Sequence, residues 1–145
     1  MDTRHVPSLE LCQELDRLCK EKGIVMPETE MYWNIKNKTL TSKPYRYIHT
    51  TKYSNLPAPL VSEQGEWLPW TLAGVDIGGD VNVSIEFQKV GDTHGVMYVE
   101  NNETVASFKD GYIEQWDDTE ANARQKMINY LIAEGIITNL WKTKQ

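Results

Sequence analysis

The sequence predicts an α+β fold in which an antiparallel β-meander sheet is packed by an N-terminal and a C-terminal helix. Three observations predict it. Both ends of the chain carry apolar residues at helical spacing, the middle carries them at a spacing of two, and short turn sequences separate the middle segments. Because no linker, repeat or low-complexity tract interrupts the 145 residues, we expect one domain, residues 1–145.

The N-terminal helix is expected from about Leu9 to Lys22. Ser8 is a suitable N-cap, Gly23 ends the helix, and Ile24 is placed to pack back on its last turn. One face of this helix is apolar and must dock on the rest of the protein; it comprises Leu11, Cys12, Leu15, Leu18 and Cys19.

The C-terminal helix follows the same design. Asp117 is its expected N-cap, with Glu120 three residues later as in a capping box, and Gly135–Ile136 ends it. Its apolar face comprises Ala121, Met127, Ile128, Leu131 and Ile132.

Residues 81–116 are predicted to form a meander of three or four strands. The first strand alternates polar residues with apolar ones, namely Val81, Val83, Ile85 and Phe87, which indicates one buried face and one wet face. Residues 91–95 favour a turn, 96–100 and 104–108 flank a second turn at Asn101–Asn102, and 110–111 turn into 112–116. Connections this short require antiparallel neighbours.

The segment between the first helix and the meander is less regular. Residues 31–35 and 45–50 are expected to add strands. Leu60 to Leu68, framed by prolines, is expected to form one or two helical turns, a prediction that Gly65 weakens.

Composition and cysteine use exclude several classes of protein. The longest apolar runs fall far short of the roughly 18 residues of a membrane span, so no membrane association is expected. The N-terminus lacks the pattern of a secretory signal, which indicates a cytoplasmic protein. Cys12 and Cys19 lie two helical turns apart, about 10 Å along the axis, which is too far for a disulfide. Both are expected to be inert core thiols, with no metal site and no cofactor.

The charge is unevenly distributed. The net charge is −6, but residues 31–62 contain five cations and no acid, which leaves −11 on the rest of the chain. Residues 100–120 carry seven acids against Lys109 alone. The overall charge makes general nucleic-acid binding an unfavourable interpretation.

The cationic segment is the candidate binding surface, because aromatic rings beside cations suit a ligand with a flat ring and phosphates. We expect Lys43, Arg46 and Lys52 to contact charge and Tyr45, Tyr47 or Trp67 to stack. The full set of candidate ligand-binding residues is Lys43, Tyr45, Arg46, Tyr47, His49, Lys52, Trp67 and Trp70. The alternative is a solvated basic face, or one that pairs with the acidic residues 100–120 within the chain or across an oligomer contact.

Known catalytic and metal-binding motifs are absent from the sequence. The glycine-rich segment 74–82 resembles a calcium loop, but Phe87 stands where the bidentate glutamate belongs. No nucleophile elbow, zinc helix or redox motif occurs. Five tryptophans exceed what the core of so small a domain needs; most are expected in the core, and one or two are expected to anchor a subunit contact.

Two segments carry a family resemblance. Residues 57–69 follow the pattern A-P-x-L-S-E-x-x-x-W-L-P, and 120–136 follow A-x-A-x-x-K-M-x-x-Y-L-x-x-x-G. Leu15 to Ile24 and Tyr32–Trp33 match as well, and the resemblance as a whole covers about three quarters of the chain. The chain thus resembles a group of small uncharacterised phage and prophage proteins, largely of gut Bacteroidetes. Val61 and Gly65 depart from the pattern, and no active-site residue can be carried over.

The resemblance implies a bacterial cytoplasm and an accessory role in the phage. We therefore expect a non-enzymatic binding protein, of the anti-defence kind, that captures a host protein or an anionic nucleotide-type ligand. One alternative is a structural, self-assembling protein, hence a homo-oligomer. The other is an unrecognised hydrolase of a nucleotide-type ligand.

Overall fold

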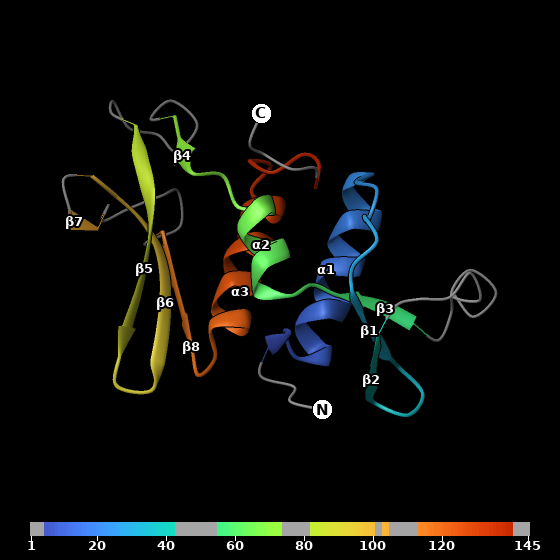
Figure 1. Ribbon diagram of the computed structural model, residues 1–145. Helices are drawn as coiled ribbons and strands as arrows, with labels where there is room; N and C mark the ends of the chain where they lie inside the picture. Colours follow the sequence, from blue (N-terminus) through green and yellow to red (C-terminus); the bar gives the residue numbers. More distant parts are fainter. Residues whose placement is uncertain (1–4, 43–54, 74–81, 101–102, 105–112, 141–145) are drawn as a thin grey trace.

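The computed structural model describes residues 5–42, 55–73, 82–100, 103–104 and 113–140 (Figure 1). It has the predicted α+β composition, with antiparallel sheets and flanking helices. In Figure 1 a large sheet lies at one side, the helices lie in the middle, and a smaller sheet lies at the other side. The smaller sheet was not predicted as a separate layer. No helix in the described part of the chain is long and apolar enough to cross a membrane.

Helix α1, Leu9–Lys22, has the predicted bounds. The hydroxyl of Ser8 accepts a hydrogen bond from the N–H of Leu11, and Gly23 ends the helix at a φ of 72°. The N–H of Ile24 returns to the carbonyl of Cys19 at 2.8 Å. A left-handed glycine at this position satisfies carbonyls that the last turn leaves open.

The small sheet joins β1, Met31–Asn34, β2, Thr39–Ser42, and β3, Asn55–Ala58, in the antiparallel order β2-β1-β3. The strand predicted at 31–35 is confirmed, whereas the one at 45–50 lies outside the described residues. The sheet packs on the first turns of α1 through a small apolar cluster of Val6, Leu9, Cys12, Trp33, Leu56 and Ala58.

Helix α2, Val61–Trp67, confirms the helical turns expected between the prolines. The carboxylate of Glu63 holds its first turn, because it accepts the N–H of Leu60 at 2.8 Å and that of Glu30 at 3.1 Å. The chain then forms the short strand β4, Thr71–Leu72, at one edge of the large sheet.

The large sheet contains β5, Val83–Val90, β6, Thr93–Glu100, β7, Glu103–Thr104, and β8, Glu114–Asp117. β4 and β5 lie on one side of β6, and both β7 and β8 pair with its other side. The turn predicted over 91–95 is only Gly91–Asp92, so that residues 93–95 belong to β6. Two turn residues suffice because Gly91 takes a φ of 62°.

Helix α3, Glu120–Ala133, lies between the large sheet and α1, with α2 alongside. Its N-cap is Thr119, whose hydroxyl accepts the N–H of Asn122, so the prediction of Asp117 as the cap was wrong. Asp117 still belongs to β8 and is too early to begin the helix. Gly135, at a φ of 79°, ends the helix as predicted.

The main core surrounds α3. Helix α1 supplies Leu15, Leu18 and Cys19, and the large sheet supplies Val83, Val96 and Tyr98. Both thiols of α1 are free and buried, as predicted, one in each apolar cluster. Because α1 packs into both clusters, the two sheets belong to one domain.

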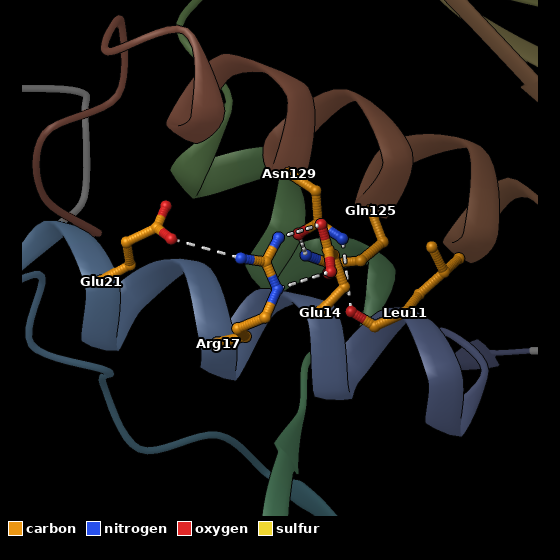
Figure 2. Close-up of polar contacts among 6 residues, drawn as sticks. All are labelled: Leu11, Glu14, Arg17, Glu21, Gln125 and Asn129. Carbon is orange, nitrogen blue, oxygen red and sulfur yellow. Dashed lines mark hydrogen bonds and ion pairs between the residues drawn. The ribbon is translucent and has the colours of Figure 1, made fainter.

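A buried chain of amides links the three helices. Gln64 on α2 donates to the carbonyl of Ala121 and to Gln125 on α3, both at 3.0 Å. Gln125 donates to Asn129 at 2.9 Å, and Asn129 donates to the carbonyl of Leu11 on α1 at 3.3 Å. Figure 2 shows Gln125 and Asn129 pointing from α3 toward α1. Buried amides are costly unless paired, so this chain fixes the register of the helices.

Beside this chain an exposed ion cluster lies on α1. Arg17 contacts Glu14 at 2.7 Å and Glu21 at 3.4 Å, and all three side chains are largely in solvent (Figure 2). The hydrogen bond from Arg17 lowers the pKa of Glu14. Exposed pairs of this kind contribute little to stability, so the cluster is a solvated face.

Candidate functional site

An apolar pocket lies between α2, α3 and β5. Its volume is about 470 Å³, which is within the range of small-molecule and side-chain sites. Its lining comes from α2, from the segment 68–70 that leads to β4, from β5 and from α3. The lining residues are Ser62, Gly65, Glu66, Leu68, Trp70, Ile85, Phe87 and Arg124.

Two exposed aromatic rings stand at this pocket. The side chain of Trp70 is 57% exposed and that of Phe87 is 42% exposed. Among the described residues only four large apolar residues are exposed, and two of them lie at this pocket. The other two are Val25 and Val90. Tryptophan in particular is enriched at the centres of protein interfaces.

The backbone that carries Trp70 is held on both sides. The buried hydroxyl of Tyr98 on β6 donates to the carbonyl of Pro69 at 2.7 Å. The N–H of Ile85 on β5 donates to the carbonyl of Trp70 at 2.9 Å. Trp70 is thus presented from a fixed backbone rather than from a loop tip, which lowers the entropy lost on binding.

Arg124 fixes the second ring. Its guanidinium carbon lies 4.1 Å from the centroid of Phe87, a cation–π distance. The guanidinium also donates to Glu120 at 2.6 Å and to the carbonyl of Val61 at 3.1 Å. Because Glu120 pairs with Arg124, and Glu66 adds a further carboxylate to the wall, the pocket has no net positive charge.

Gly65 makes room for this arginine. A Cβ at Gly65 would lie 3.1 Å from Nη1 of Arg124, closer than side chains usually approach. The glycine that seemed out of place in the short helix therefore allows α2 and α3 to pack closely around the guanidinium.

The structure describes two of the eight ligand-binding residues predicted from the sequence and places them in different environments. Six of the eight lie outside the described residues: Lys43, Tyr45, Arg46, Tyr47, His49 and Lys52. Trp67 is 5% exposed and packs in the main core, so its ring faces no ligand. Trp70 lies at the pocket. The other tryptophans include Trp33, which is buried.

Two acids of the stretch 100–120 pair with cations of helix α3. Asp117 contacts Lys126 at 2.7 Å, and Glu120 contacts Arg124. Burial alone raises the pKa of Asp117, but hydrogen bonds from Lys126, from the N–H of Asp118 and from Asn122 outweigh it and hold that pKa below its ordinary value. These acids are therefore matched by local cations on α3.

A second hollow, of about 320 Å³, lies where the N-termini of α1 and α3 meet. The N–H of Ser8 donates to Asn122 at 2.8 Å across this junction. Lys38, one of the basic-segment cations, lines it, and so does Glu10, which offsets the charge.

Reactive groups are few in the described part of the chain. Burial raises the pKa of the Cys12 thiol to about 12 and that of Cys19 to about 11, so both stay protonated at neutral pH. No group of three or more histidine, cysteine or acidic side chains there is placed to hold a metal ion.

Comparison of the chain with protein-family models, with curated proteins and with solved structures found no match. The functional assignment therefore rests on the geometry of the pocket.

Sequence reasoning missed Phe87 and Arg124 as pocket residues. Phe87 was expected on the buried face of its strand, with Val83 and Ile85. Burial instead decreases along β5, from 1% exposure at Val83 to 42% at Phe87, because the helices cover only the start of the strand. No sequence feature sets Arg124 apart from the other polar residues of its helix, and its partner Phe87 lies 37 residues earlier in the chain.

Proposed function

We propose that this is a non-enzymatic binding protein of the phage accessory kind, and that its pocket takes an apolar side chain of a host protein. The observation that carries the proposal is that two exposed rings line one pocket: Trp70, just before β4, and Phe87, on β5. The backbone that carries Trp70 and the ring of Phe87 are both held in place before a ligand arrives.

The charge of the pocket favours a protein ligand over an anionic nucleotide. A phosphate needs donors that are not already engaged. The charge of Arg124 is already paired with Glu120, and its two terminal nitrogens donate to Glu120 and to the carbonyl of Val61. One face of the guanidinium lies over the ring of Phe87, and its Nε has no partner among the described residues but is buried, so it is not exposed to a ligand. An apolar or aromatic group needs only the rings and the apolar floor, which Leu68 and Ile85 supply.

A titration followed by NMR tests the binding chemistry with three probes: indole, adenosine and adenosine monophosphate. We expect indole to shift the amide resonances of Gly65, Trp70 and Phe87. Trp70→Ala is expected to weaken indole binding by roughly 5- to 30-fold, equivalent to about 1–2 kcal/mol. Val25→Ala, which removes an apolar side chain 79% exposed at another site, is the matched control and should bind indole normally.

The comparison of the two adenosine probes decides between the ligand classes. Equal affinity for adenosine and its monophosphate agrees with a pocket whose arginine is already paired. Tighter binding of the monophosphate would shift the assignment to the nucleotide ligand, and no resonance shift with any probe would remove the pocket as a binding site.

Affinity capture from host cells tests the partner class. Wild-type protein, Trp70→Ala and Val25→Ala are used as baits, and captured proteins are quantified by mass spectrometry. A host protein retained by wild type and Val25→Ala but lost with Trp70→Ala is the expected result. Retention of the same proteins by all three baits would contradict the proposal.

A further inference from the structure

Among the described residues, one edge of the large sheet is unpaired over five residues of β5. On the side away from β6, β5 pairs with β4 only at Val83 and Ser84, and Ile85 adds one hydrogen bond to Trp70. From residue 86 to residue 90, no other described strand pairs with this side. Figure 1 shows β4 beside the start of β5 only.

Two residues carry the backbone groups of this open edge. In an antiparallel sheet, the N–H and C=O of one residue point to the same side, and the side alternates along the strand. Because the N–H of Ile85 points to β4, the backbone groups of Phe87 and Lys89 point to that side as well. Unpaired strand edges are sites at which another strand adds.

We propose that a second copy of this chain pairs its own β5 with this edge, antiparallel, with Gln88 opposite Gln88 at the two-fold axis. In this register Phe87 of each copy lies opposite Lys89 of the other copy. The backbone groups of Phe87 and Lys89, which no described strand pairs, thereby bond to those of Lys89 and Phe87 in the second copy. The edge is self-complementary, as a two-fold interface requires.

The neighbouring registers fit less well. Placing Phe87 opposite Phe87 sets Lys89 opposite Ile85, whose N–H is already bonded to β4. Placing Lys89 opposite Lys89 brings like charges face to face, which is destabilising. The register centred on Gln88 avoids both, since Glu86 then lies opposite Val90.

The length of the free edge matches the strand that would fill it. The available stretch begins after Ile85, where Trp70 occupies the edge, and β5 ends at Val90. In the second copy the Gly91–Asp92 turn begins opposite Ile85 and leads the chain away to β6.

Single cysteines test the register directly. Across the two-fold axis, Gln88 and its symmetry mate form a non-hydrogen-bonded pair with Cα atoms about 4.5 Å apart. That distance is within the range for a disulfide. Gln88→Cys is therefore expected to form a disulfide-linked dimer on mild oxidation. Glu86→Cys is the matched control: its mates lie about 14 Å apart, four residues along the strand, and should not link.

A proline removes the edge without touching the sheet. Lys89→Pro deletes an N–H that points outward, a place where strands tolerate proline. Sedimentation velocity should show a concentration-dependent dimer for wild type and for Lys89→Thr, which keeps the N–H, but a monomer for Lys89→Pro. Circular dichroism establishes that the proline variant is folded; if it is not, the cysteine pair decides alone.

Three results would overturn this inference. They are a wild-type monomer at concentrations up to about 1 mM, equal cross-linking of Gln88→Cys and Glu86→Cys, or a folded Lys89→Pro that dimerises like wild type. The inference is independent of the pocket ligand, since Trp70→Ala should weaken indole binding and still dimerise.

Discussion

Gly95 on β6 lies directly opposite Trp116 on β8, and the indole ring covers the glycine. A Cβ at residue 95 would come within 2.6 Å of Cζ3 and 2.7 Å of Cε3 and Cη2 of that ring. Ordinary contact begins at 3.4 Å, so Gly95→Ala must displace the ring or the strand by about 0.8 Å.

The cost of this displacement can be bounded. Overpacking in a well-packed place costs about 1–3 kcal/mol. Replacing glycine by alanine recovers about 0.4–1 kcal/mol, because it restricts the unfolded chain. Trp116 is only half-buried, so its ring can yield toward solvent and the net loss should lie near the lower end, about 0.5–2 kcal/mol. In a domain of this size, that lowers Tm by roughly 2–6 °C.

A double-mutant cycle isolates the contact. Urea unfolding followed by circular dichroism gives the free energy of unfolding for wild type, Gly95→Ala, Trp116→Ala and the double variant. Once Trp116 is truncated, the alanine at position 95 should cost nothing or stabilise slightly. The steric reasoning is refuted if Gly95→Ala is as stable as wild type, or if it loses the same free energy in both backgrounds.

Three further outcomes follow from the described contacts. Gln125→Met breaks the buried amide chain and leaves polar partners unpaired, so the free energy of unfolding should fall by about 1–3 kcal/mol in urea titrations; an unchanged value would show that the chain is dispensable. The lowered pKa of Asp117 contributes stability that is complete above about pH 4 and is lost as the pH falls through the folded-state pKa. The stability difference between wild type and Asp117→Asn should therefore shrink on acidification, and a constant difference would contradict this. Cys12 and Cys19, with raised pKa values, should resist alkylation at pH 8 until urea unfolds the protein, as mass spectrometry would show; rapid labelling of the native protein would refute their burial.

Local chemistry made much of the fold predictable. The stripe of α1, its serine cap and its terminal glycine gave the helix bounds without error, because each depends on residues within one or two turns. The cap of α3 was misplaced because two acceptors, Asp117 and Thr119, stand near its start, and only the pairing of β8 decides between them.

The pairing of strands that lie far apart in the sequence could not be predicted from local patterns. Nothing near β1 specifies that β3 lies beside it, across more than twenty residues, so the small sheet was not foreseen. The pocket has the same origin. Arg124 on α3 meets Phe87 where the inner face of β5 becomes exposed, whereas the period-two alternation predicts that this face is buried along the whole strand.

Helix α1 packs against both sheets. Leu9 and Cys12 belong to the apolar cluster under the small sheet, whereas Leu15 and Leu18 belong to the main core between the helices and the large sheet. These fourteen residues therefore connect the small sheet to the rest of the protein. Unfolding of α1 would remove packing contacts from both sheets at once. Heating should therefore unfold the protein in a single cooperative step, without earlier loss of the small sheet.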